Sequence, residues 1–247
     1  MILSHRFRFP ILFLLGVSAF IIFPGCTSHD VPPTPMTASF DMQPVPKHTK
    51  TVSGWKQAWN VLLGKTPIKE VKMMENQDSP DQRRQGIYKL VSKEFGQHEP
   101  YTRRYRQIAQ TDTDPLVRAA AIRALNESRD RQAVPIFIAG LADPSPYVRL
   151  QAAKALSNVP DPTAADPLSR TLGNTAEQKD VRIAAAEALR NYRQIGVARV
   201  LAATLSGRDF SVAWQSRWSL RILTGADYKY DEHAWLAYLT GPTKPLG

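Results

Sequence analysis

The sequence predicts an all-α fold, an α-solenoid of about five stacked antiparallel helix pairs. The first observation behind this prediction is a segment that recurs at a nearly constant period. The valines that mark its copies stand 31, 33 and 31 residues apart, and a leucine follows each of them eight positions later: Val117 and Leu125, Val148 and Leu156, Val181 and Leu189, Val212 and Leu220. Repetition in this range of periods is typical of stacked helix pairs, in which no single pair can bury its own apolar face.

The second observation is a stripe of small residues in every copy. They stand four and seven positions after the marking valine: Ala121 and Ala124, Ala152 and Ala155, Ala185 and Ala188, Ser216 and Ser219. These spacings place them on one face of a 3.6-residue helix. Small side chains let neighbouring helices approach closely.

The first helix pair is expected within residues 78–110. Gln82, Arg83, Gly86 and Leu90 fill the same register positions 35 residues before Val117, and residues 101–110 form the second helix of this pair. In the middle repeats the second helices are expected at residues 132–142, 164–172 and 195–205. The apolar stripe on the first of these is interpreted as core: Ala133, Val134, Ile136, Phe137 and Leu141.

The last copy, residues 209–220, is degenerate and leads into a final helix. Gly225 is expected to stop its helix, and Asp231 to start the final one, which ends at Gly241. Trp214 and Trp218 stand four residues apart beside two arginines. We interpret these tryptophans as a seal for the open end of the stack; a paired aromatic clamp for a ligand is the alternative.

Three copies share a pattern that resembles a known family. They read DPLVRAAAIRAL from Asp114, DPSPYVRLQAAKAL from Asp143 and DVRIAAAEAL from Asp180. This Asp-Pro-x-Val-Arg-x-x-Ala-x-x-Ala-Leu form resembles the short HEAT repeat, in the subtype also found in phycobilin lyase components, over roughly residues 78 to 240. The resemblance implies a helical solenoid, with the first helix of each pair on its convex side. It also implies a protein-binding scaffold more often than an enzyme.

The same resemblance implies a role for one arginine in each complete copy. Arg118, Arg149 and Arg182 match the ladder arginine of the family, which usually bonds an aspartate of a neighbouring repeat. Such partly buried pairs are structural. The last copy lacks this arginine because Ala213 follows Val212, as is expected of an atypical terminal repeat.

The amino terminus has the pattern of a secretory signal segment, residues 1–25. Arg6 and Arg8 precede an uncharged apolar run over residues 11–23. Thirteen helical residues span roughly 20 Å at 1.5 Å per residue, less than the roughly 30 Å of a hydrocarbon layer. A membrane-spanning anchor is therefore disfavoured.

Cys26 is the single cysteine of the chain and directly follows this segment. The ending Phe23-Pro24-Gly25-Cys26 resembles a bacterial lipobox, which implies lipidation at Cys26, although Phe23 and Pro24 depart from the usual residues. Thr27 is not the aspartate that resembles an inner-membrane retention signal, which favours the outer membrane. An ordinary signal or signal anchor with an incidental cysteine is the alternative.

The organisation that follows from these patterns has four parts. A signal segment (1–25) precedes the lipidated cysteine with a Pro/Thr-rich tether (26–50), a capping helix with a linker (51–77) and the HEAT-like domain (78–247). The tether is too rich in proline and small polar residues to form a core. The capping helix is expected over residues 52–63, where Trp55 and Trp59 share an apolar face with two leucines. A membrane-surface or partner-binding helix is the alternative there.

The densest basic cluster lies in the first helix pair. Our candidate partner-binding residues are the five arginines Arg83, Arg84, Arg103, Arg104 and Arg106. The chain has a net charge of +10, and removal of Arg6 and Arg8 leaves 30 basic and 22 acidic residues, or +8. Such a cluster suits an acidic protein, anionic lipid or a phosphate backbone, or it is a solvated helix face. Nucleic acid is disfavoured as a partner because an exported protein rarely meets it.

The sequence shows no pattern of catalytic chemistry. The five histidines are scattered, with no spacing suited to a metal, and there is no Gly-rich phosphate loop or nucleophile elbow. We therefore expect no catalytic residues, no cofactor, no metal and no enzymatic activity. The leading hypothesis is an exported, lipid-anchored scaffold for an unknown protein of the cell envelope. An enzyme or lyase-like subunit, or a nucleic-acid-binding protein, is the alternative for a chain that is not exported, and a purely structural envelope component is a third.

Overall fold

The computed structural model describes residues 67–242 and residue 246. They belong to one compact unit of the chain, Val52–Gly247. The predictions for the signal segment, for Cys26, for the tether and for the helix over residues 52–63 all lie outside the described residues.

All the regular secondary structure within residues 67–242 is helical, and these residues form no strand. Five antiparallel helix pairs follow one another along the chain: α3 (Pro80–Val91) and α4 (Tyr101–Thr111), α5 (Pro115–Glu127) and α6 (Val134–Gly140), α7 (Pro146–Asn158) and α8 (Ala165–Gly173), α9 (Lys179–Leu189) and α10 (Ile195–Ala203), α11 (Phe210–Thr224) and α12 (Glu232–Thr240). Short 3₁₀ turns, Glu94–Gln97, Arg131–Ala133 and Pro162–Ala164, lie in three of the connections. The predicted all-α fold of stacked helix pairs is confirmed.

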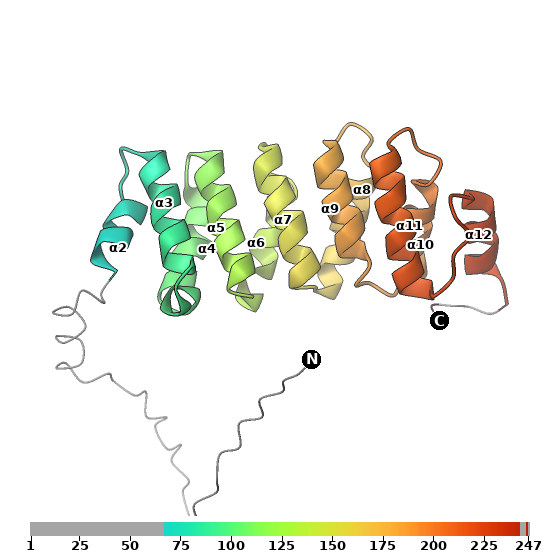
Figure 1. Cartoon of the computed structure of the whole chain (residues 1–247), viewed down its shortest axis with the longest axis horizontal. Helices are drawn as coiled ribbons and strands as arrows, with labels where there is room; N and C mark the ends of the chain where they lie inside the picture. The colour runs from blue at the N-terminus through green and yellow to red at the C-terminus, as the bar shows by residue number, and fades with distance from the viewer. Residues whose placement is uncertain (1–66, 243–245, 247) are drawn as a thin grey trace, which may run out of the picture. The chain divides into compact units, whose positions relative to one another are not determined.

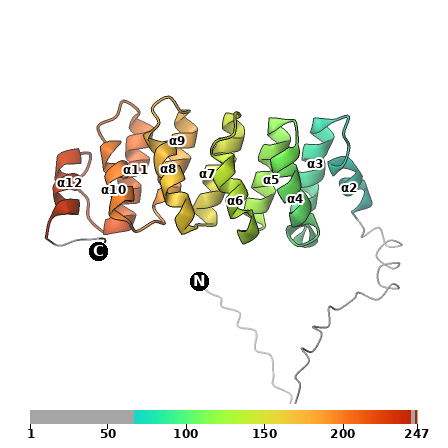
Figure 2. The same cartoon turned by 180° about the vertical axis from the view of Figure 1, so that it is seen from behind.

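The pairs stand side by side in a row and form two layers (Figures 1 and 2). The first helices, from α3 to α11, make one layer and pack against one another more extensively than the second helices do. The small residues of the predicted stripe are fully buried on both sides of this layer: Ser219 of α11 donates to the carbonyl of Ala186 in α9, and Ala152 of α7 lies against Gly140 of α6. Buried leucines of both layers fill the space between them. The core therefore runs the length of the row and has no single centre.

Local signals in the sequence set the helix ends. The Asp114 carboxylate accepts hydrogen bonds from the backbone N–H groups of Leu116 and Val117 at the start of α5, where Pro115 occupies the first turn. Gly225 ends α11 with a positive φ of 75°, a conformation that glycine adopts without strain. The Asp231 carboxylate caps α12 through the N–H of Ala234. Gly225 and Asp231 thus end and start these helices as predicted.

One helix precedes the first pair and was not predicted. Helix α2 (Ile68–Met74) packs against α3, at the site where Gly86 has no side chain. A Cβ atom on Gly86 would lie 2.4 Å from the backbone N of Met74 and 2.7 Å from the carbonyl O of Glu70. Gly86 therefore permits a backbone contact that any other residue would prevent.

The predicted role of two tryptophans is wrong. Trp214 and Trp218 are 50% and 43% exposed on the outer face of α11, so they do not seal the stack. Among the three described tryptophans, Trp235 of α12 is the buried one, with ring contacts to Tyr228 and Tyr238 and an indole N–H that donates to the carbonyl of Lys229. The i, i+4 spacing of Trp214 and Trp218 shows only that they share a helix face. It does not show whether that face is covered.

Candidate interaction surfaces

A ladder of arginines links consecutive repeats in the layer of first helices. Arg118 donates two hydrogen bonds to Asp143, of 3.0 and 2.9 Å, and Arg149 donates two to Glu177, of 2.7 and 2.8 Å. Arg182 donates to Asp209 at 3.1 Å and to the carbonyl of Leu172. The structure thus places all three arginines against an acid of the next repeat, and for Arg149 that acid is a glutamate where the resemblance implies an aspartate.

Two of these acids, Asp143 and Glu177, also organise the chain beside them. The Asp143 carboxylate accepts the N–H of Ser145, and the backbone carbonyl of the same residue accepts from Arg149. Burial alone would raise the pKa of Asp143, but the hydrogen bonds from Arg118 and Ser145 outweigh it and hold this pKa below its usual value. The same balance lowers the pKa of Glu177, through Arg149 and the N–H of Gln178.

Arg83 belongs to this ladder. Its guanidinium donates two hydrogen bonds to Asp112, of 2.8 and 2.9 Å, and two to the carbonyls of Asn76 and Gln77. The side chain is buried, which corrects our assignment of Arg83 to an exposed contact patch. The physical reason is its register: Arg83 stands where Arg118 stands in the next copy.

The other four arginines of the predicted patch all have carboxylate partners. Arg84 pairs with Asp81 within α3, and Arg104 pairs with Glu75. Arg103 and Arg106 share Glu99, and Arg106 also pairs with Asp130. Arg103 is the most exposed of the four, and Arg106 the least. The charge of this face is therefore more nearly balanced than its residue types suggest, and its role in binding stays a prediction.

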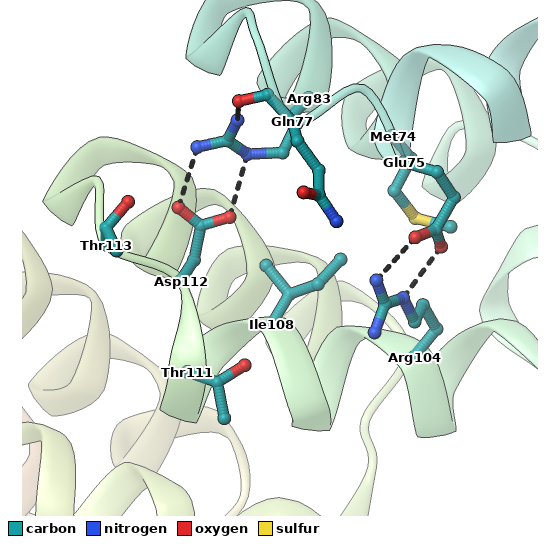
Figure 3. Close-up of a pocket in the computed structure, with 9 residues that line it drawn as sticks. All are labelled: Met74, Glu75, Gln77, Arg83, Arg104, Ile108, Thr111, Asp112 and Thr113. Carbon is teal, nitrogen blue, oxygen red and sulfur yellow. Dashed lines mark hydrogen bonds and ion pairs between the residues drawn. The ribbon is translucent and has the colours of Figure 1, made fainter.

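A pocket of about 290 Å³ lies where α2, α3 and α4 meet (Figure 3). Its two cationic side chains, Arg83 and Arg104, are turned toward carboxylates of the same pocket, Asp112 and Glu75. Met74 and Ile108 supply its apolar lining. The pocket presents paired charges, so a ligand that binds there must compete with an ion pair.

Comparison with known proteins assigns this repeated unit to a family. The family of HEAT repeats matches residues 103–190 and, in a second overlapping match, residues 137–221. The chain contains HEAT repeats. None of the curated proteins compared with the sequence matches it.

One solved structure supports the fold of this HEAT-repeat array. The crystal structure of an engineered protein is 18% identical, with a TM-score of 0.52 over 73% of this chain and 91% of that chain. Human deoxyhypusine hydroxylase in complex with glycerol is 16% identical, with a TM-score of 0.45 over 66% of this chain and 75% of that chain. At these identities the similarity concerns the fold alone.

The last HEAT repeat carries an exposed apolar stripe that sequence reasoning missed. Four side chains, one helical turn apart, point outward from α11: Phe210 (66% exposed), Trp214 (50%), Trp218 (43%) and Ile222 (47%). The two indole rings are parallel, with centroids 6.3 Å apart. Reading the same register positions across all copies of the HEAT repeat could have found this stripe, because the earlier copies place charged residues there.

Within residues 67–242, no helix is both long enough and apolar enough to cross a bilayer. Nor do the described HEAT repeats gather three or more histidine, cysteine or acidic side chains in an arrangement suited to a metal ion.

Proposed function

We propose that this protein is an exported, lipid-anchored scaffold that binds another protein of the cell envelope. The observation that carries the proposal is the HEAT-repeat array itself. The arginine ladder joins consecutive helix pairs, so the array presents a long, preformed helical surface. Repeat arrays of this kind bind partners along such surfaces. The phycobilin-lyase-like subtype stays a prediction.

The proposed anchor is Cys26. It is the only cysteine, it follows an apolar segment, and the sequence between it and Pro67 is long enough for the array to lie either at the lipid surface or clear of it. The test compares the intact mass and membrane partition of the natively expressed chain with those of a Cys26→Ser variant. We expect loss of the first 25 residues and a lipid mass that depends on Cys26. An unprocessed chain in the soluble fraction of cells would contradict export and would favour an enzyme subunit or a nucleic-acid-binding protein.

The proposed contact face is the first helix pair, which carries Arg84 on α3 and Arg103, Arg104 and Arg106 on α4. An acidic partner would exchange with the carboxylates that now pair with these arginines, so binding should weaken as salt is raised. Arg83 is excluded because it belongs to the ladder.

The contact face is tested by crosslinking in intact cells. A triple variant, Arg84→Ala, Arg103→Ala and Arg104→Ala, should recover several-fold less of the crosslinked partner, with unchanged helicity by circular dichroism. A matched control replaces three exposed arginines of the later repeats, Arg170, Arg193 and Arg199, and should recover as much as the natural chain. Equal recovery by both variants at low salt would contradict the contact face. Failure of the natural chain to retain any partner would favour a purely structural component.

A further inference from the structure

The outer stripe of α11 differs in kind from the equivalent surface of every other first helix. The repeat register gives Phe210, Trp214, Trp218 and Ile222 four counterparts in each of the other copies. These are Pro80, Arg84, Tyr88 and Ser92 in the copy of α3; Pro115, Ala119, Arg123 and Glu127 in that of α5; Pro146, Leu150, Lys154 and Asn158 in that of α7; and Lys179, Ile183, Glu187 and Asn191 in that of α9. Each of these sets contains at least one charged residue and at most one large apolar side chain besides proline. The outer face is therefore partly charged on the four other first helices and apolar on α11.

The size of the stripe argues against a second copy of the chain as its occupant. Three half-exposed aromatic side chains offer roughly 300 Å² of apolar surface, which is the size of a functional patch on a monomer. A stable protein interface covers about 800 Å² on each partner. In a symmetric dimer the cations that flank the stripe would also face each other.

Positive charge surrounds the stripe. Arg217, Arg221 and Lys229 share one carboxylate, Asp227, at N–O distances of 2.7, 3.6 and 3.3 Å. The Arg221 guanidinium lies 5.2 Å from the ring centre of Trp218. The cations are thus part of the aromatic surface.

Two acids near the stripe already have cationic partners. Asp209 pairs with Arg182, and Glu187 with Arg190. Arg208, just before α11, makes no ion pair with any residue that the structure describes. The local balance of charge therefore favours an anionic partner.

We propose that the outer face of α11 docks on an anionic phospholipid bilayer. The stripe stands out from the helix layer, and protruding aromatic side chains insert into a lipid interface, where tryptophan is enriched. The flanking cations bind the headgroups, as they do in interfacial amphipathic helices. This inference rests on the proposed function in one respect: the anchored tether keeps the array close to a membrane. Docking of α11 would then orient the array on the surface.

The test uses the full chain with Trp55→Phe and Trp59→Phe, reconstituted in vesicles of phosphatidylglycerol and phosphatidylethanolamine. Three tryptophans remain, and Trp235 is buried, so Trp214 and Trp218 report on contact with lipid. Lipids brominated on their acyl chains quench an indole only on close approach. We expect substantial loss of emission on these vesicles and a smaller loss on vesicles of phosphatidylcholine. The chain used here is unprocessed and keeps the apolar segment of residues 11–23, which favours the lipid whether or not Cys26 is lipidated.

Two double variants make the test specific. Phe210→Ser with Ile222→Ser keeps both reporters and should lose most of the quenching. Leu116→Ser with Tyr147→Ser removes two exposed apolar side chains from α5 and α7 and should quench like the parent chain. Lipid docking would be overturned if the emission of the parent chain were not quenched on anionic vesicles. It would also be overturned if the variant with Phe210→Ser and Ile222→Ser were quenched as strongly as the parent chain. A third outcome would also overturn the proposal: the tryptophan emission is protected from soluble acrylamide but not quenched by lipid, and the protein has twice the mass of one chain. The stripe would then bind a second copy of the chain.

Discussion

Three of the four ladder arginines join neighbouring repeats through contacts of one kind. In Arg83, Arg118 and Arg149 one edge of the guanidinium binds both oxygens of an acid in the next repeat, and the remaining nitrogen donates to backbone carbonyls. The ammonium group of a lysine cannot reproduce this arrangement of hydrogen bonds, because it is a single point charge and not a planar group with several fixed N–H donors. The ladder therefore depends on arginine specifically.

We expect Arg118→Lys to lower the free energy of unfolding by roughly 2 kcal/mol, since it removes two charge-assisted hydrogen bonds at a partly buried site. Urea denaturation followed by circular dichroism measures the change. Arg123→Lys is the matched control, because the Arg123 pair with Glu127 lies exposed within one helix and should contribute less than about 0.5 kcal/mol. Equal effects of the two substitutions would contradict a structural ladder.

The ladder acids also predict how stability depends on pH. The pKa values of Asp143 and Glu177 are lowered in the folded protein, so both carboxylates release their protons more readily there than in the unfolded chain. Their contribution is fully present above the unfolded pKa of about 4 and is lost as pH falls through the folded pKa. Urea midpoints should therefore fall on acidification below about pH 4. The double variant Arg118→Gln with Arg149→Gln should have a lower urea midpoint than the natural chain at neutral pH, and its midpoint should change less with pH. Urea midpoints of the two proteins that fall in parallel on acidification would contradict the role given to Asp143 and Glu177.

At the scale of the element, Gly86 decides whether α2 can join the array. Gly86→Ala would place a Cβ atom against the backbone of Met74, so α2 must move away from α3. We expect hydrogen exchange to lose protection in residues 68–74, while α5 to α9 keep theirs, because stability in a repeat array is set by neighbouring contacts. Gly173→Ala is a matched control, since its Cβ would meet no atom within 4 Å. Unchanged protection of α2 in Gly86→Ala would contradict the close approach.

The elements themselves follow from local sequence far more directly than the surfaces do. The alanine stripe and its period predict the five pairs, and the helix expected over residues 195–205 is observed as Ile195–Ala203. Spacing cannot choose between two helix faces, which is why Trp214 and Trp218 were misplaced. Nor can it show which acid meets which arginine, because Arg83 and Asp112 are distant in sequence and meet only after the repeats stack. Reading each position across all copies recovers part of this information, since Arg83 then falls in the ladder register.

At the scale of the whole molecule, the array has two ends that are closed differently. Helix α2 covers the first pair, whereas the other end is closed by α12, the second helix of the last pair, which packs against α10 and buries Trp235 and Leu239. An array whose repeats contact only their neighbours unfolds from a weakened end, not all at once. The two ends should therefore respond independently to mutation.

Trp235→Ala tests this independence at the carboxyl end. The substitution removes a fully buried indole, its two aromatic contacts and its hydrogen bond to Lys229, at a cost of about 3–5 kcal/mol to the last repeat. Hydrogen exchange should accelerate in α12 and α11 and remain slow in α3, α5 and α7. Trp214→Ala is the control, because this half-exposed side chain should affect protection in α12 little. A uniform loss of protection from α3 to α12 would show that the array unfolds as one cooperative unit, and the described repeats could then not be treated as a chain of nearest neighbours.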